Sequence, residues 1–334
     1  MTRFGYHQKC RFATSSIDGF PALRMKDFMA KERNRKKTQS QQRTVTPSSA
    51  NEKLDPGSRR PTSNRLFLWF IFVGSLVGSM AVMTYLRLPP ATAPVYTYQV
   101  LRSIKHDSAA FTQGLLIDND RLYESTGRTG QSSLRTLDLA TGKVITRKDL
   151  PDHYFAEGIT LYGSKLYQLT FQNNRIRVYD KDSLELLEER DFEFEGWGLT
   201  SDADYLIHSD GSATIRYLDP ETLEVVSKVT VHDGSQKIRH INELEYFDGR
   251  IYANVWHEDF ILQIIPASGR VSARYDMTGL LQPRSEDREA CLNGIAVDRE
   301  SGTFYLTGKL WPKIFEVKFV EKKPSDATQP TSKD

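Results

Sequence analysis

The chain has 334 residues, 39% of them hydrophobic and 26% charged, and its formal net charge is +2. This near-neutrality combines a basic and an acidic part, because residues 1–65 hold 15 Lys and Arg against 5 Asp and Glu, whereas residues 88–334 hold 29 against 38. The basic part has almost no apolar periodicity. It therefore predicts a solvated, disordered tail, and no nucleic-acid partner is expected.

A stretch of 21 residues without charge follows the tail at 66–86 and is flanked by Arg65 and Arg87. A helix needs about 20 apolar residues to cross the hydrocarbon core of a membrane, so this stretch predicts a transmembrane helix. It begins too far along the chain for a cleaved signal peptide. Basic residues crowd its N-terminal flank, and the positive-inside rule then places the tail in the cytosol. We expect a single-pass type II signal-anchor protein of the secretory pathway, ER or Golgi, with its main domain in the lumen.

Gly74 and Gly78 have the Gly-x-x-x-Gly spacing of helix dimers, but glycine is common in membrane helices, so a weak homodimer and a monomer both stay open. The expected topology places Cys10 in the cytosol and Cys291 in the lumen, which excludes an intrachain disulfide. The Pro-rich segment 87–94 predicts a stiff stalk.

The rest of the chain repeats one pattern five times, a short start followed by a strand, a turn and a second strand. The spacings between successive copies are 44, 40, 45 and 51 residues, measured at Gly114, Gly158, Gly198, Glu243 and Gly294. A period of roughly 40–50 residues is that of a four-stranded propeller blade. The sequence therefore predicts an all-β fold, a five-bladed β-propeller over residues 95–320.

Turns rich in Asp, Pro or Gly separate the later strands of four copies, at 138–142, 180–183, 219–222 and 266–269. The fifth copy ends after its third strand, 314–319. We expect residues 95–104 to supply the missing fourth strand and so close the ring without an exposed edge. The polar segment 321–334 predicts a second disordered tail.

The first strand of each propeller blade lines the central channel, so equivalent repeat positions face one another there. The residues directly before the five reference positions are Gln113, Glu157, Trp197, Asn242 and Asn293. Other strand ends bring further side chains to the same mouth, namely Phe111, Phe155, Phe171, Ser209, Trp256 and Lys309. A buried Glu among aromatic rings is costly without a partner or a role, which favours an active site. A structural pair of Glu157 with Lys309, with tryptophans plugging the channel, is the alternative.

Seven short motifs occur in this region in a fixed order: Phe-Thr-Gln-Gly (111–114), Phe-Ala-Glu-Gly (155–158), Gly-Trp-Gly-Leu (196–199), Asn-Glu-Leu-Glu-Tyr (242–246), Asn-Val-Trp (254–256), Leu-Asn-Gly-Ile-Ala (292–296) and Thr-Gly-Lys-Leu-Trp-Pro (307–312). Together they make the chain, over about residues 96–319, resemble the plant-type glutaminyl cyclases. The resemblance implies a five-bladed propeller with an active site at one end of its channel. It also implies that N-terminal glutamine of peptides and proteins is converted to pyroglutamate with release of ammonia.

By the same motifs, the resemblance places the central acid at Glu157. We assign Lys309 and Asn242 as its catalytic neighbours, and Lys309 with Asn242 or Asn293 would donate to the developing oxyanion. The substrate-binding residues are then Phe111, Gln113, Phe155, Phe171, Trp197, Trp256 and Asn293. Phe171 departs from the family pattern, which usually has Trp there, and this removes an indole N–H donor. No cofactor and no catalytic metal are expected, because the histidines after the stalk are scattered along the sequence.

Two other functions are considered. A calcium-dependent, lactonase-like propeller would bind its ion through oxygen ligands, which Glu157, Asn242 and Asn293 offer. Such a site usually needs a second carboxylate, and none is expected on this ring. A structural calcium in the channel stays open. A non-catalytic propeller would use the same aromatic mouth to hold a peptide end.

Overall fold

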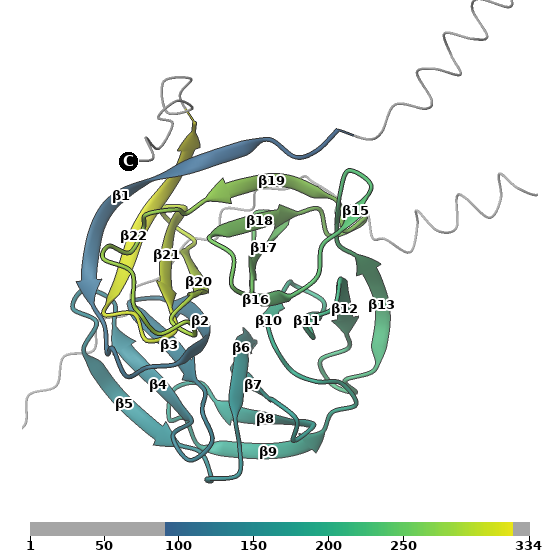
Figure 1. The fold of residues 1–334 in the computed structure, drawn as a ribbon. Helices are drawn as coiled ribbons and strands as arrows, with labels where there is room; N and C mark the ends of the chain where they lie inside the picture. Colours follow the sequence, from purple (N-terminus) through teal and green to yellow (C-terminus); the bar gives the residue numbers. More distant parts are fainter. Residues whose placement is uncertain (1–90, 323–334) are drawn as a thin grey trace, which may run out of the picture. The chain divides into compact units, whose positions relative to one another are not determined.

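The computed structural model describes residues 91–322, and this part is all-β (Figure 1). Within it, no helix is long and apolar enough to cross a membrane. The predicted tail 1–65, the predicted span 66–86 with its Gly74 and Gly78, and residues 323–334 lie outside the described residues.

Three antiparallel four-stranded sheets follow one another along the chain. The first contains β2 (Thr112–Asp118), β3 (Arg121–Thr126), β4 (Ser133–Asp138) and β5 (Val144–Asp149). The second contains β6 (Ala156–Tyr162), β7 (Lys165–Thr170), β8 (Arg175–Asp180) and β9 (Leu186–Asp191). The third contains β10 (Leu199–Ser201), β11 (Leu206–Ser209), β12 (Thr214–Leu218) and β13 (Val225–Thr230), and a small pair follows it, β14 (His232–Asp233) with β15 (Gln236–Lys237).

The remaining strands form one eight-stranded sheet in the order β16-β17-β18-β19-β1-β22-β21-β20. Four of them are β16 (Ile241–Phe247), β17 (Arg250–Val255), β18 (Phe260–Ile264) and β19 (Val271–Asp276). The other four are β1 (Val95–Lys105), β20 (Leu292–Asp298), β21 (Thr303–Gly308) and β22 (Lys313–Glu321).

Strand β1 joins the two halves of this sheet. It pairs antiparallel with β22 along its length, from Tyr96↔Glu321 to Lys105↔Lys313. Its parallel pairing with β19 involves only Val95↔Arg274 and Tyr96↔Tyr275. The prediction that the first strand of the domain completes the sheet of the last repeat is therefore confirmed.

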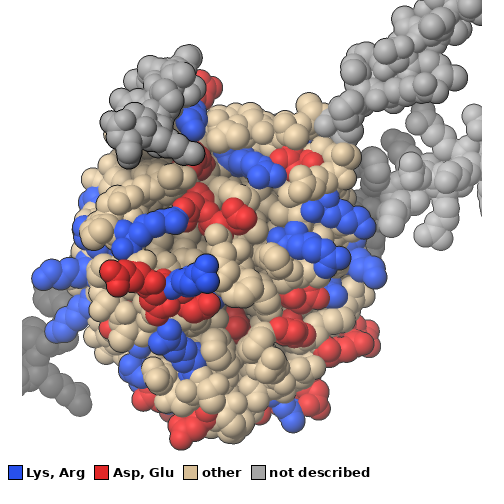
Figure 2. Space-filling model, viewed as in Figure 1, with Lys and Arg blue, Asp and Glu red and all other residues tan. Residues whose placement is uncertain are grey.

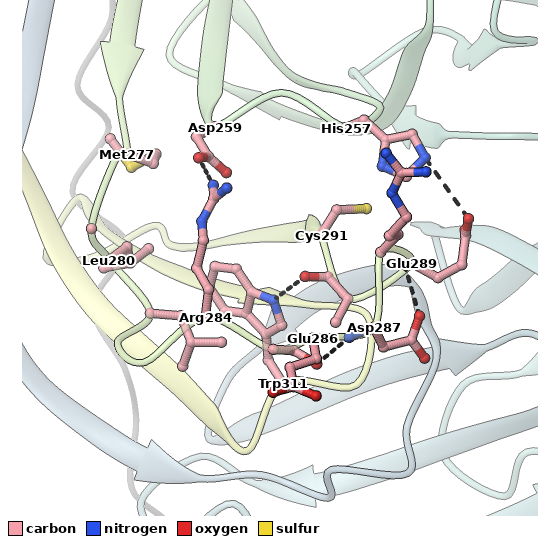
Figure 3. Close-up of a pocket in the computed structure, with 15 residues that line it drawn as sticks. His257, Asp259, Met277, Leu280, Arg284, Glu286, Asp287, Glu289, Cys291 and Trp311 are labelled. Atoms are coloured by element: carbon pink, nitrogen blue, oxygen red, sulfur yellow. Dashed lines mark hydrogen bonds and ion pairs between the residues drawn. The ribbon is translucent and has the colours of Figure 1, made fainter.

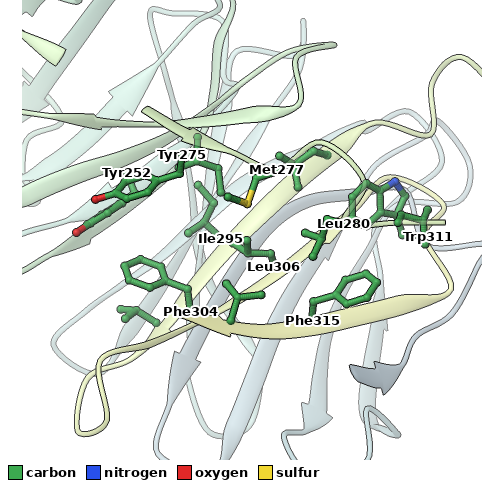
Figure 4. Packing of buried hydrophobic residues seen from close by; sticks show 14 of the residues in the cluster. Tyr252, Tyr275, Met277, Leu280, Ile295, Phe304, Leu306, Trp311 and Phe315 are labelled. Atoms are coloured by element: carbon green, nitrogen blue, oxygen red, sulfur yellow. The ribbon is translucent and has the colours of Figure 1, made fainter. Parts of the chain in front are cut away.

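Figure 1 shows β2, β6, β10, β16 and β20 around the centre of the described part, with β5, β9, β13, β19 and β1 at its outside. Apolar clusters fill the spaces between neighbouring sheets. The largest lies between β16–β19 and β20–β22 and includes Tyr252, Phe304, Leu306 and Phe315 (Figure 4). On the face drawn in Figure 2, acidic and basic side chains are interspersed, so this face offers no continuous basic surface.

The repeated glycine has a steric cause in the inner strands. A Cβ at Gly158 would lie 2.5 Å from the Leu199 nitrogen, and one at Gly198 would lie 2.0 Å from the Asn242 oxygen. Real Cβ atoms do not approach backbone atoms so closely, so these two positions need glycine where the chain meets the next sheet.

Four of the five inner strands carry an irregularity at this same place. The register with the neighbouring strand shifts between Thr112 and Gly114, between Ala156 and Ile159, between Ile241 and Leu244, and between Leu292 and Ile295. A β-bulge redirects side chains, and it is common beside functional sites. These bulges contain the polar residues that the repeat alignment singled out.

Candidate active site

The bulged strand starts bring four predicted polar side chains into the interior. Gln113, Glu157, Asn242 and Asn293 are all buried, with at most 5% of their surface exposed. The fifth member of the set, Trp197, precedes the short strand β10 and is half-buried. The prediction from equivalent repeat positions thus selected four polar residues that the fold does bury, and hydrogen bonds link three of them.

Glu157, Gln113 and Asn293 are linked by hydrogen bonds. Gln113 Nε2 donates to Glu157 Oε1 at 3.0 Å. Asn293 Nδ2 donates to Gln113 Oε1 at 3.4 Å and to the Thr112 carbonyl at 2.9 Å. Gln113 therefore orients one oxygen of the Glu157 carboxylate, and Asn293 orients Gln113.

Two electrostatic effects act on Glu157 in opposite directions. Burial raises the pKa of Glu157 well above its ordinary value, because the charged form loses its hydration. The charge of Lys309 lowers this pKa, and the charge of Glu195 raises it. A buried carboxyl group held beside a lysine can both accept and return a proton, which is the property of a general acid–base residue.

Lys309 lies in the same region without a direct ion pair. Only 5% of its surface is exposed, and its ammonium nitrogen lies 4.9 Å from the centroid of the Phe111 ring. No carboxylate of the described part lies within 4.0 Å of this nitrogen. The alternative in which Glu157 and Lys309 form a direct structural pair is therefore wrong, and the ammonium donors stay available to a ligand.

The aromatic side chains form two groups. Phe155 lies between Phe111 and Phe171, with ring centroids 6.1 Å and 5.8 Å away and edge-to-face geometry. Trp197 and Trp256 meet edge to face at 5.8 Å. Two apolar surfaces of this kind can hold a short aliphatic side chain such as that of glutamine.

Two buried amide oxygens in the site have no hydrogen-bond partner within the described residues, Asn242 Oδ1 and Asn293 Oδ1. An unpaired buried acceptor is costly, so such atoms suggest a ligand or water that donates to them. Asn293 already uses its Nδ2 on the Thr112 carbonyl and Gln113, so it offers an acceptor rather than an oxyanion donor.

A second buried carboxylate, Glu243, lies one position after the ring residue Asn242. Glu243 stands where the other four repeats have a glycine, and it is 1% exposed. Its Oε1 accepts from the Leu115 backbone nitrogen at 3.2 Å, and its Oε2 accepts from that of Ile295 at 2.9 Å. Both oxygens are thus engaged by neighbouring inner strands. No group of three or more His, Cys, Asp or Glu placed to hold a metal ion occurs in residues 91–322.

Sequence reasoning also missed a buried pair beside the site. His106 and Glu124 have fully buried side chains, and His106 Nε2 lies 2.9 Å from Glu124 Oε1. His106 Nδ1 lies 2.7 Å from the Trp311 carbonyl, and the Thr112 hydroxyl donates to the same Glu124 oxygen at 2.7 Å. The pair therefore connects the segment after Lys309 to the start of β2. His106 precedes the first repeat, so the repeat alignment gave no signal for it.

A cavity of about 590 Å³ lies next to this site (Figure 3). It is lined by residues of the segment 277–291 and by His257, Asp259 and Trp311. A second cavity, of about 860 Å³, is lined by residues from the far ends of the inner strands, among them Glu245 and Arg299.

The described site has the features of an enzyme active site for a small polar group. It contains a buried carboxyl group with a raised pKa, a buried lysine and two groups of aromatic side chains. The family model that describes glutamine cyclotransferases matches residues 74–319. The chain belongs to this family.

Two relatives support this assignment. The glutaminyl-peptide cyclotransferase of Arabidopsis thaliana is 39% identical over 226 residues, which cover 66% of this chain and 70% of the relative. The crystal structure of Myxococcus xanthus glutaminyl cyclase matches with a TM-score of 0.66 and 35% identity, over 69% of this chain and 100% of that one.

Proposed function

We propose that this protein is a glutaminyl-peptide cyclotransferase that converts N-terminal glutamine of peptides and proteins to pyroglutamate and ammonia. The observation that carries the proposal is the Glu157 carboxyl group, which is buried with a raised pKa and held by one side-chain amide. Family membership and the Arabidopsis relative support the same activity.

In the proposed reaction, the substrate's α-amine attacks the δ-carbon of its own side-chain amide. Two aromatic surfaces hold the folded glutamine in the geometry for attack. Phe111, Phe155 and Phe171 form one surface, and Trp197 and Trp256 form the other. Such positioning can supply much of the rate enhancement of an intramolecular reaction. The α-amine titrates near about 7.7–8.0, so a useful neutral fraction exists at neutral pH.

Glu157 moves the proton in this mechanism. It accepts a proton from the attacking nitrogen as the new C–N bond forms. It then donates that proton to the side-chain nitrogen, the old C–N bond breaks, and ammonia leaves. Lys309 and Asn242 stabilise the oxyanion of the tetrahedral intermediate, and Gln113 holds Glu157 in place. The unpaired Oδ1 of Asn293 accepts a hydrogen bond from the substrate amine.

We propose that the described part is a five-bladed propeller, the catalytic domain at 95–320. The proposal is supported by the three separate four-stranded sheets and by the narrow β1–β19 junction that divides the eight-stranded sheet into two more. Hydrogen–deuterium exchange would test it, because each blade predicts one protected inner strand and one less protected outer strand.

We also propose the type II topology, with a cytosolic tail at 1–65, a membrane helix at 66–86, a stalk at 87–94 and the catalytic domain in the lumen of the ER or Golgi. The uncharged stretch and its basic N-terminal flank support this. Protease added to sealed microsomes should remove the tail and spare the catalytic domain. Loss of both would contradict the topology.

The experiment for the activity measures ammonia release from a short peptide that begins with Gln, using the full-length chain, Glu157→Gln and a metal chelator. We expect turnover that survives the chelator and falls about 10²–10⁴-fold in Glu157→Gln. Chelator-sensitive turnover would favour a calcium-dependent site. A folded chain that binds the peptide without releasing ammonia would favour a binding propeller.

A further inference from the structure

The cavity of about 590 Å³ shares backbone segments with the proposed active site. His257 follows Trp256, and their rings lie 4.3 Å apart. Cys291 is two residues before Asn293, and its carbonyl accepts from the Lys309 backbone nitrogen at 2.9 Å. Figure 3 shows His257, Cys291 and Trp311 around the cavity. The cavity therefore begins where the site ends, on the side of β17 and β20.

The floor of the cavity is apolar. Met277, Leu280 and Trp311 line it and belong to the large buried cluster between the last two groups of strands. They are 2%, 6% and 5% exposed, so their packing holds the floor in place. The aliphatic or aromatic part of a ligand side chain can pack on this floor, and the burial of its apolar surface favours binding.

The rim of the cavity has an acidic excess. Its lining includes four carboxylates and two guanidinium groups; Asp259 pairs with Arg284, and Asp287 pairs with Arg128, which lies outside the lining. Glu289 lies 3.9 Å from His257 Nε2, and Glu286 forms no ion pair within 4.0 Å in the described part. The rim therefore favours a cationic group over an anionic one.

We propose that this cavity is a substrate subsite for a lysine or arginine side chain at the second or third position of the peptide, after the N-terminal glutamine. The inference rests on the proposed cyclotransferase activity. Trp256 of the proposed site and His257 of the cavity lining are consecutive residues, and an extended peptide advances about 3.3–3.6 Å per residue, so we assign the cavity to the second or third residue. The methylene stem lies on the apolar floor, and the charged end meets Glu286 and Glu289.

The experiment uses the full-length chain with glutaminamide and with two peptide sets, in which Lys, Ala or Glu occupies the second or the third position. We expect kcat/KM for the Lys peptide to exceed that for the Glu peptide about tenfold at one of these positions, which is ~1.4 kcal/mol. The difference should reside in KM and shrink with added salt, because the rim is exposed to solvent.

The matched variant is Glu286→Lys combined with Glu289→Lys, and the control is Glu300→Lys, a rim residue of the other cavity. The double variant should reverse the Lys-over-Glu preference and leave glutaminamide turnover unchanged, whereas the control should keep the preference. Equal kcat/KM values across the peptides, or a preference that the double variant leaves intact, would overturn the subsite. No turnover of glutaminamide or of any peptide would overturn the cyclotransferase proposal and the subsite together.

Discussion

Glu157 and Glu243 are both buried in bulged starts of inner strands, yet their carboxylates differ in what holds them. Glu243 accepts backbone N–H groups of two other inner strands, one on each oxygen. Glu157 accepts one hydrogen bond, from the side chain of Gln113, and has the charge of Lys309 nearby. Burial raises the pKa of both groups. Burial alone therefore does not distinguish a reactive carboxyl group from a structural one; the fixed backbone donors do.

Glu157 and Glu243 occupy repeat positions that differ by one residue. Asn242, not Glu243, occupies the place equivalent to Glu157, and Glu243 occupies the place of the glycines. A side chain at the glycine place points into the contact between inner strands, where backbone groups are within reach. The side chains one residue earlier in three repeats, Gln113, Glu157 and Asn293, instead form hydrogen bonds with one another.

The largest effect outside Glu157 itself is expected at Lys309. In Lys309→Met the side chain keeps its length and loses its charge, so the oxyanion loses a donor and kcat should fall about 10²–10³-fold. The kinetic pKa assigned to Glu157 should rise, because the charge that lowers it is gone.

The matched control is Arg128→Met, since the Arg128 guanidinium lies 4.5 Å from the centroid of the same Phe111 ring but is partly exposed. Equal losses of kcat in both variants would mean that catalysis needs a positive charge beside the Phe111 ring, and not a hydrogen-bond donor to the oxyanion.

A second prediction extends the comparison to Glu124, a buried carboxylate neutralised by a histidine. Burial lowers the pKa of His106, because it disfavours the charged imidazolium. The charge and hydrogen bond of Glu124 and the hydrogen bond to the Trp311 carbonyl raise this pKa by more, so it lies above 6.5. Burial raises the pKa of Glu124, but the charge and hydrogen bond of His106 lower it by more, so this pKa lies below 4.5. The stability that the pair contributes is thus present between pH 4.5 and 6.5 and is lost as the pH rises through the folded pKa of His106.

Denaturant unfolding of His106→Gln measures this contribution. The variant should lose about 1–3 kcal/mol near pH 6, and this loss should shrink at pH 9. His153→Gln, at an exposed position, is the control and should change little. A loss at His106→Gln that is the same at both pH values would show that the pair is not charged.

A third prediction concerns Glu245, two residues after Glu243 and at the far end of the channel. Burial raises the pKa of Glu245 to about 8, although Arg299 opposes this. The folded protein therefore keeps a proton that the unfolded chain releases near 4.5, so the stability of the wild type should fall as the pH rises from 4.5 to about 8.

Glu245→Gln should make this fall in the free energy of unfolding smaller, because Glu157 and Glu243 also have raised pKa values and remain, and the exposed Glu221→Gln should keep the whole fall. Parallel pH profiles for the wild type and Glu245→Gln would contradict the assignment of the raised pKa to this group.

The smallest effect is expected at the aromatic wall. Phe171→Trp restores the residue that the family resemblance places there and adds one N–H donor. One hydrogen bond contributes about 0.5–1.5 kcal/mol, so KM should fall a few-fold with little change in kcat. A change in kcat of tenfold or more would place Phe171 in the chemistry rather than in binding.

The repeat pattern was enough to predict an all-β fold, the supply of the last sheet's missing strand by residues 95–104, and the burial of Gln113, Glu157, Asn242 and Asn293. It could not predict the bulges, because a register shift depends on pairing between strands and leaves no period in one strand's residues. The hydrogen bonds of Glu243 were not predicted for a related reason. Its partners are backbone N–H groups of other sheets, which have no side-chain signature. The His106–Glu124 pair was not predicted because His106 lies outside the repeats.

The central claim is that Glu157 is reactive and Glu243 structural, and the most direct measurement compares Glu157→Gln with Glu243→Gln for both kcat and the free energy of unfolding. Glu157→Gln should lose about 10²–10⁴-fold in kcat and keep its stability. Glu243→Gln should lose about 1–3 kcal/mol of stability, because one oxygen can no longer accept a backbone N–H, and the folded protein should keep its kcat within a few-fold. A folded Glu243→Gln without activity, or a Glu157→Gln that is active and destabilised, would contradict the account.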